Sequence, residues 1–306
     1  MTPPLVAEAP PAPPAPVLLA VALPFAPPAA PAPAEPTETN EDPRRAQRTR
    51  LLLGQLRRLR TELRTTADAR DLGRLDARRV LVLAPHPDDE VIGCGALIQR
   101  RVAAGAQVTV VFITQEGARS IVRHQGEPVR RRVVESRRAV ADLGVVRVAY
   151  LELEELSLSR DAEAYDRLRA ALAELIGGMG PGLVLAPGDG EMHPDHRAVC
   201  RATLEAMDAL WAADEIDLDT PVALYEVWGG GEANAYLRVA PAEMAAKRLA
   251  MGRYASQTET ADYLAIMELL HETRGRTLAG GFTPAEGYFL LRGAEEARAR
   301  LLNPTA

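Results

Sequence analysis

Cysteines and long apolar runs are scarce in this sequence of 306 residues. Its two cysteines, Cys94 and Cys200, lie far apart and form no Cys-x-x-Cys pair, which fits unpaired thiols in a reducing compartment, although one long-range disulfide stays open. No apolar run is long enough to span a bilayer. The run at residues 17–26 is short, is interrupted by Pro24 and follows no Lys or Arg, so it predicts no secretory signal. We therefore expect a cytoplasmic protein.

Positive charge is also in short supply. The chain has 36 Lys and Arg residues against 42 Asp and Glu residues, which gives a net charge of −6 at pH 7. A general nucleic-acid binder would usually be basic, so we expect no nucleic-acid partner. Apolar residues make up 47% of the chain, which is ordinary for a globular protein and allows a sizeable core without disulfides.

Two segments precede the main domain. Residues 1–43 contain 14 of the 24 prolines, interleaved with alanine, and predict a disordered or polyproline-like extension. In residues 44–75, leucines recur at helical spacing among arginines, which predicts a basic amphipathic helix. This helix could pack on the main domain, bind a partner, or make weak contact with an anionic membrane surface through residues 44–70. The last alternative would make the protein peripheral at the inner face of the membrane.

Strand-like and helix-like patterns alternate from residue 76 to residue 295. Strands are expected at residues 80–84, 107–114, 145–151, 183–186 and 222–227, and helices at residues 95–104, 130–143, 163–176, 193–210, 241–254 and 261–274. Such alternation implies right-handed βαβ crossovers and a mostly parallel sheet. The prediction is therefore one α/β domain, followed by a tail at residues 296–306.

Two short polar segments follow strands of this sheet. Residues 86–90 read His-Pro-Asp-Asp-Glu, directly after the strand at 80–84. Residues 193–196 read His-Pro-Asp-His, shortly after the strand at 183–186. Because ligands of such sheets sit beyond the carboxyl ends of the strands, both segments should reach the same edge.

The two segments combine the donor groups of a metal centre. Three adjacent carboxylates, Asp88, Asp89 and Glu90, repel one another unless a cation or strong donors compensate. Two imidazoles, one carboxylate and an open position for water make a catalytic zinc site. The alternative, a pair of ordinary helix-capping turns, is disfavoured because both segments lie at strand ends. The other histidines, His124 and His271, lie outside such segments and are expected to be surface or structural residues.

At these residues the chain resembles the PIG-L / LmbE-like N-deacetylase family. Residues 84–90, with Gly-Cys-Gly at 93–95, resemble its first signature, and residues 193–196 resemble its second. Further matches occur at residues 132–135, 143–144, 224–227 and 254–257, and the similarity covers about residues 79–292. The resemblance implies a Rossmann-like three-layer fold and zinc-dependent removal of acetyl from an N-acetylated sugar, usually an N-acetylglucosamine unit.

The resemblance also implies a role for each signature residue. The expected ligands of one zinc ion per chain, or of another divalent metal, are His86, Asp89 and His196. Asp88 matches the general base that accepts the proton of the attacking water. His193 matches the residue that stabilises the oxyanion or protonates the leaving amine. Asp195 and Glu90 are expected to contact these groups and orient them without binding the metal.

One stretch departs from the family pattern. After the second strand the family often has Thr-x-Gly-Glu, whereas this chain has Thr-Gln-Glu-Gly at residues 114–117, so a sugar-binding role for Glu116 does not carry over. Arg119 and Arg132 are candidate substrate contacts, with an ordinary surface or helix-face arginine as the alternative for each. Cys94 and Cys200 fall within helix patterns and are expected to be small core residues.

Three other functions compete with amino-sugar deacetylation. A non-haem iron oxygenase also uses two histidines and a carboxylate, although usually on an all-β scaffold. A metal-dependent deacylase of a non-sugar amide would have the same fold and site. A catalytically silent sugar-binding protein would be favoured by a missing ligand or base, and none is missing. The sequence leaves the substrate open among soluble sugar conjugates, lipid-linked sugars and glycosylated metabolites.

Overall fold

The structure is a computed structural model that describes residues 46–47, 49–50, 69–115, 121–124, 127–228 and 232–304. Residues 1–43 and most of the predicted basic helix therefore lie outside the described residues. Residues 46–47 and 49–50 are helical, and the hydroxyl of Thr49 accepts a hydrogen bond of 2.7 Å from the backbone amide of Asp262. This contact ties the start of the basic segment to the main domain. No described helix is both long and apolar enough to cross a membrane.

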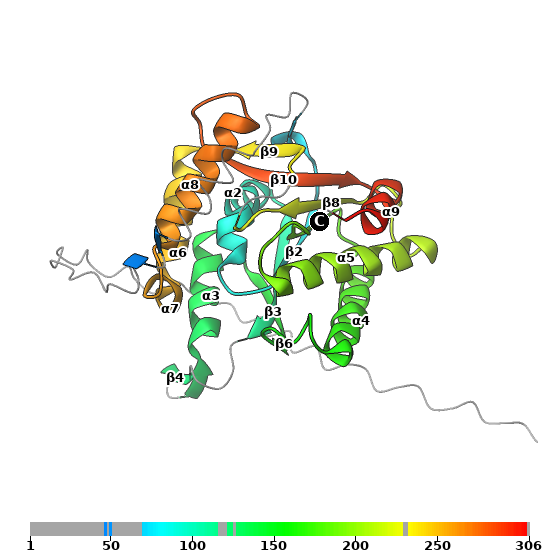
Figure 1. Ribbon diagram of the computed structural model, residues 1–306, viewed down its shortest axis with the longest axis horizontal. Coiled ribbons are helices and arrows are strands. Elements are labelled where there is room, and N and C mark those ends of the chain that lie inside the picture. Colours follow the sequence, from blue (N-terminus) through cyan, green and yellow to red (C-terminus); the bar gives the residue numbers. More distant parts are fainter. Residues whose placement is uncertain are drawn as a thin grey trace, which may run out of the picture.

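An eight-stranded sheet forms the centre of the described domain (Figure 1). Its strands are β1 (Arg70–Asp71), β2 (Arg79–Ala84), β3 (Gln107–Gln115), β6 (Arg147–Glu154), β7 (Leu183–Pro187), β8 (Pro221–Tyr225), β9 (Ala235–Arg238) and β10 (Ala285–Arg292), in the spatial order β1-β9-β10-β8-β7-β2-β3-β6. The strands from β8 to β6 run parallel to one another, whereas β10 is antiparallel to both of its neighbours. The predicted α/β fold with a mostly parallel sheet is confirmed.

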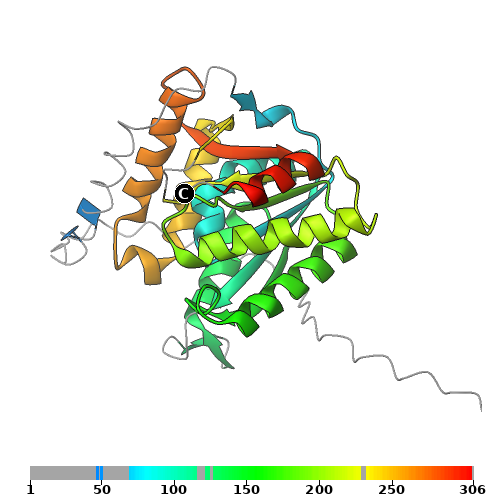
Figure 2. The ribbon, with the colours of Figure 1, turned by 45° about the vertical axis from the view of Figure 1, so that its right-hand side comes forward.

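Helices cover both faces of the sheet, which gives three layers (Figure 2). One face carries α2 (Asp89–Ala103), α3 (Arg131–Asp142), α6 (Pro241–Gly252) and α8 (Tyr263–Thr277), with the short α7 (Ala255–Thr258) between the last two. The other face carries α4 (Ala162–Met179), α5 (Pro194–Ala212) and α9 (Ala294–Leu302). Alternate residues of β2 enter opposite cores, Val80 and Val82 on the first face and Leu81 and Leu83 on the second. This double burial explains the continuous apolar run at 80–84.

Several boundaries differ from those predicted from the sequence. Residues 70–74, expected in the basic helix, instead form β1 and the 3-10 helix η1 (Leu72–Arg74), because Leu72 packs into the core and β1 pairs with β9. A tail was expected from residue 296, but α9 continues to Leu302 and buries Ala297 against α5. The sequence patterns also did not predict β9 and β10. A small hairpin, β4 (Ile121–His124) and β5 (Glu127–Arg130), completes the described elements.

Candidate metal centre

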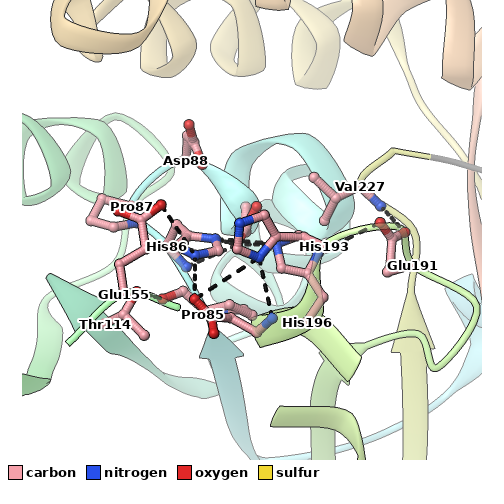
Figure 3. Close-up of polar contacts among 12 residues, drawn as sticks. Pro85, His86, Pro87, Asp88, Thr114, Glu155, Glu191, His193, His196 and Val227 are labelled. Carbon is pink, nitrogen blue, oxygen red and sulfur yellow. Dashed lines mark hydrogen bonds and ion pairs between the residues drawn. The ribbon is translucent and has the colours of Figure 1, made fainter. Parts of the chain in front are cut away.

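The carboxyl ends of β2 and β7 bring the two polar segments together. These strands are neighbours in the sheet, and β2 leads into the turn at 85–88 while β7 leads into the loop at 188–193. Figure 3 shows His86 from the first segment beside His193 and His196 from the second. The predicted position of both segments at one edge of the sheet is therefore what the structure has.

Three donor atoms form a nearly regular triangle. His86 Nδ1 lies 3.2 Å from Asp89 Oδ2 and 3.2 Å from His196 Nε2, and His196 Nε2 lies 3.1 Å from Asp89 Oδ2. A tetrahedral ion that binds such atoms at about 2.0 Å needs them about 3.3 Å apart. All three side chains are buried. The spacing and the donor set, two imidazole nitrogens and a carboxylate oxygen, therefore fit a zinc-like cation.

The electrostatics of this triangle favour positive charge. Burial alone would lower the pKa of both histidines, but Asp195 and Asp89 raise the pKa of His86 to about 8, and Asp89 and Glu191 raise that of His196 to about 10. Burial likewise opposes ionisation of Asp89, yet the two histidines hold its pKa well below the usual range. The site thus stabilises a cationic charge, which a divalent metal would supply in place of protons.

The outer nitrogen of each triangle histidine faces a buried carboxylate. His86 Nε2 lies 3.3 Å from Asp195 Oδ2, and His196 Nδ1 lies 3.5 Å from Glu191 Oε2. Carboxylates in this position hold the proton on the outer nitrogen and leave the inner nitrogen free to bind a metal. Asp195 was predicted in a supporting role, whereas Glu191 was missed. Its only signal is an acidic residue two positions before His193 in the loop after β7.

Both supporting carboxylates are fixed by backbone amides. Asp195 Oδ2 accepts a hydrogen bond of 2.8 Å from the amide of Leu156. Glu191 Oε1 accepts one of 2.7 Å from the amide of Val227, and Glu191 Oε2 accepts one of 3.1 Å from the amide of Trp228. The loops after β6 and β8 therefore anchor the groups that orient the two histidines.

Asp88 lies next to the triangle but outside it. Its backbone has φ 126 and ψ −27, a conformation that is strained for a residue with a side chain. In Figure 3 its carboxylate points away from His86 and His196, and Asp88 Oδ2 lies 3.6 Å from Arg132 Nη2. Burial and the neighbouring Asp89 raise the pKa of Asp88 to about 7, which suits a group that exchanges a proton near neutral pH.

Residues from three other positions hold the strained turn. Glu90 Oε2 accepts a hydrogen bond of 3.1 Å from the Asp88 amide, and the Tyr254 hydroxyl donates to the other Glu90 oxygen. Arg132 Nη2 donates to the carbonyl of Pro87 at 3.2 Å. Glu90 thus contacts the backbone of Asp88 rather than the triangle, and its supporting role stays a prediction. Arg132 is buried against this turn rather than exposed on a helix surface, and Tyr254 was not singled out from the sequence.

His193 lies over the triangle from the start of α5. Its Nδ1 accepts the backbone amide of Asp195 at 3.2 Å and so caps the helix. Its ring stands edge-on to that of His86, with 4.5 Å between the ring centroids. Burial, reinforced by His86 and His196, lowers the pKa of His193 to about 4, so the ring is neutral. Since Nδ1 is an acceptor, the proton lies on Nε2, which is then a donor.

One ring nitrogen from each of His86, His193 and His196 lies within 4.8 Å of the other two, so a metal could also be shared among the three histidines. Glu155, which the sequence reasoning missed, reaches the same edge from the end of β6, with Oε1 3.9 Å from His86 Nε2. Arg119 and Glu116 lie outside the described residues, as does the side chain of His124.

Three remaining predictions concern residues away from the triangle. Cys94 and Cys200 are free thiols buried in α2 and α5, as expected of small core residues. His271 is buried as well, and its Nε2 lies 2.6 Å from Lys247 Nζ, which agrees with the structural role expected of it.

The fold and the site together define an α/β protein with a candidate divalent-metal centre at the sheet edge. Residues 81–207 match the family model PIG-L, described as GlcNAc-PI de-N-acetylase. The matched region contains both polar segments, and the match confirms the family resemblance predicted from them.

Two named deacetylases are similar in sequence to part of this chain. A diacetylchitobiose deacetylase of Thermococcus kodakarensis is 30% identical over 138 residues, which cover 43% of this chain and 50% of that protein. A 1D-myo-inositol 2-acetamido-2-deoxy-alpha-D-glucopyranoside deacetylase of Mycolicibacterium gilvum is 31% identical over 159 residues, covering 44% of this chain and 56% of that protein. The chain thus matches only about half the length of these relatives.

A solved structure has a similar fold over a longer part of the chain. The N,N'-diacetylchitobiose deacetylase from Pyrococcus horikoshii superimposes with a TM-score of 0.57 at 20% identity, covering 85% of this chain and 96% of that one. The Rossmann-like three-layer arrangement is therefore shared with an enzyme structure over nearly its whole length.

Proposed function

We propose that this protein is a metal-dependent N-deacetylase that hydrolyses the acetamide of an N-acetylated amino sugar to acetate and a free amine. The observation that carries the proposal is the triangle of His86, Asp89 and His196, with Asp88 beside it but outside the ligand set. The names of the two relatives support the same reaction class, since both are deacetylases of acetamido sugars.

Zinc is the proposed metal, one ion per chain, with another divalent metal as the alternative. His86, Asp89 and His196 would hold it, because their donor atoms match the spacing of a tetrahedral ion. When bound, such an ion polarises a carbonyl and lowers the pKa of water to roughly 7. His193 is assigned outside the ligand set because its Nδ1 accepts the Asp195 amide, which leaves the proton on Nε2, and because its ring is partly exposed.

Two residues of the chain are assigned to proton transfer and oxyanion stabilisation. Asp88 accepts the proton of the attacking water, held in place by Arg132 and by the Glu90 contact to its amide. His193 donates a hydrogen bond from Nε2 to the carbonyl oxygen as negative charge develops there. A nearby cation would lower the pKa of His193 further, so this ring stays neutral. Asp88 therefore passes the proton on to the leaving nitrogen, and the C–N bond breaks.

The proposed substrate is a small N-acetylglucosaminyl conjugate, soluble or lipid-linked. The two named relatives act on a chitobiose and on an inositol-linked sugar, so the group attached to the amino sugar varies among them. Glu155, partly exposed at the site, would disfavour an anionic group close to the acetamide. Membrane contact through residues 44–70 and a cytoplasmic location stay predictions.

The test is acetate release from a panel of acetamides. Zinc-loaded protein would be incubated with N-acetylglucosaminides that differ in the attached group and with non-sugar acetamides, and acetate and free amine would be quantified. We expect equal amounts of both products from sugar substrates only, and none after chelation. Equal turnover of simple acetamides would favour a general deacylase. Sugar binding by calorimetry without acetate would favour a binding protein, and dependence on oxygen would favour an oxygenase.

A further inference from the structure

The helix that carries Asp89 and Glu90 is broken one turn after it begins. Cys94 in α2 has φ −141 and ψ 18, which are not helical values. In an unbroken helix the amides of Ala96 and Leu97 would bond to the carbonyls of Ile92 and Gly93. At the break these groups need other partners, because buried backbone groups are rarely left unpaired.

A buried ion pair supplies those partners. Glu286 Oε1 accepts the amide of Ala96 at 2.7 Å, and Glu286 Oε2 accepts the amide of Leu97 at 3.0 Å. Lys247 Nζ donates to the carbonyl of Ile92 at 3.1 Å and also contacts Glu286 Oε1. The carboxylate therefore caps the second part of α2, while the ammonium group caps its first turn.

The ion pair is itself fixed by two further buried side chains. Lys247 Nζ lies 2.6 Å from His271 Nε2, and the Tyr288 hydroxyl donates to Glu286 Oε2 at 2.7 Å. Lys247 comes from α6 and His271 from α8, which cover the same face of the sheet as α2, and Glu286 and Tyr288 come from strand β10 of that sheet (Figure 1). A buried ion pair stabilises a fold no better than a well-packed apolar pair. Its place at the break of α2 therefore points to a geometric role.

The chain around the break is closely packed at two glycines. A Cβ at Gly93 would lie 2.2 Å from the ring of Tyr225, and a Cβ at Gly95 would lie 3.2 Å from Lys247 Cγ. Tyr225 is in turn bonded to the carbonyl of Leu83 in β2 at 2.8 Å. The first turn of α2 is thus packed against the sheet on one side and against Lys247 on the other.

We propose that Lys247 and Glu286 are positioning residues, which set the direction of the first turn of α2 and so hold the Asp89 carboxylate at the metal triangle. This inference rests on the metal centre of the proposed function. Neither residue touches the triangle in the hydrogen bonds and ion pairs of the described residues, so each acts through the backbone of α2.

Cobalt titration of the full chain tests this role, because the visible absorption of Co²⁺ reports coordination without any substrate. Lys247→Met leaves Glu286 buried without its cation, and the double variant Lys247→Met/Glu286→Gln removes both charges. We expect the double variant to regain much of the thermal stability that the single variant loses, because it leaves no unpaired buried charge. Its Co²⁺ affinity should nevertheless remain about tenfold or more below that of the parent, with an altered absorption band.

Arg100→Met is the matched control. Arg100 joins α2 to α6 beyond the break, through Glu243 at 2.8 Å, so this variant loses an ion pair between α2 and the helix that carries Lys247. We expect its Co²⁺ affinity and absorption band to match the parent. A folded double variant that binds Co²⁺ like the parent would overturn the proposal, as would an equal loss in the control.

Two measurements keep the test decisive if the double variant does not fold or the parent binds no cobalt. Tyr288→Phe removes only one hydrogen bond to Glu286 and should weaken Co²⁺ binding a few-fold; unchanged binding in this variant contradicts the proposal. Without metal, hydrogen exchange at the amides of Val91 and Ile92, both bonded to the carbonyl of Asp88, should be faster in Tyr288→Phe than in Arg100→Met. A parent that binds no cobalt would refute the proposed metal centre, whereas equal exchange would refute the positioning role.

Discussion

The two polar segments meet at one site but are built differently. The first, residues 86–90, is a buried turn with a strained residue, Asp88 at φ 126, followed by a helix that breaks after one turn. The second, residues 193–196, is a regular helix start, with His193 as the capping residue and Pro194 in the first turn. The first contains two proposed ligands and the proposed base Asp88, whereas the second contains the third ligand, the proposed oxyanion donor His193 and one of the supporting carboxylates.

The supporting carboxylates show that neither segment makes the site alone. Asp195 of the second segment orients His86 of the first, and Glu191, just before the second segment, orients His196. Strain of the kind found at Asp88 costs about 1–3 kcal/mol and persists only where the surroundings enforce it. Here Glu90, Arg132 and Tyr254 do so. Arg132 from α3 and Tyr254, the residue before α7, therefore stabilise the backbone of the first segment, whereas the backbone of the second is capped locally by His193.

The largest expected effect comes from removing a ligand of the second segment. His196→Ala takes one corner from the triangle and should reduce bound zinc, measured by mass spectrometry of the dialysed protein, to near zero. His193→Ala is the comparison, because Asp89 rather than His193 completes the proposed ligand set, and it should keep its zinc while losing activity. Loss of zinc from His193→Ala with normal binding in Asp89→Ala would show that the three histidines are the ligands instead.

The next effect isolates the proton carrier of the first segment. Asp88→Asn should keep zinc but lower kcat by roughly 10²–10⁴, the usual contribution of a general base, because the amide cannot accept the water's proton. Asp89→Asn, one residue further on, should instead lose zinc. Zinc content and acetate release measured on both variants separate the roles. Normal turnover by Asp88→Asn would mean that another group moves the proton.

Sequence patterns predicted the second segment more completely than the first. The strands covered on both faces, such as β2 and β7, are visible as apolar runs, and the start of α5 follows from local capping preferences. The broken α2 is not visible in this way, because its cause is a pair of side chains, Lys247 and Glu286, more than 150 residues away along the chain.

The missed elements have a similar physical cause. Strand β10 contains a buried Glu286 and Gly287 in an antiparallel position, which no simple apolar pattern predicts. Glu191 and Tyr254 have roles that depend on contacts between distant parts of the chain. Glu191 accepts the amide of Val227 just after β8, and the Tyr254 hydroxyl donates to Glu90. The candidate ligands could be proposed from the sequence because histidine and carboxylate at strand ends are a local signal, whereas the residues that contact them depend on tertiary packing.

The smallest expected effects compare the two supporting carboxylates. Asp195→Asn weakens the contact that holds the first segment's His86 and should lower zinc affinity by roughly 10–100-fold, as is usual for such partners. Glu191→Gln should lower it less, about tenfold at most, because its contact with His196 is longer at 3.5 Å.

Competition with a chelating dye measures both affinities, and Glu205→Gln, on the outer part of α5, serves as the matched control. If Glu191→Gln weakened zinc binding more than Asp195→Asn, the longer contact would be the more important one. The amides of Val227 and Trp228 just after β8 would then be the reason, since they fix the Glu191 carboxylate and a weakening of these bonds would release His196 together with its loop. Equal and negligible effects would instead mean that the histidines are oriented by packing alone, and the second segment would supply a ligand without supporting the first.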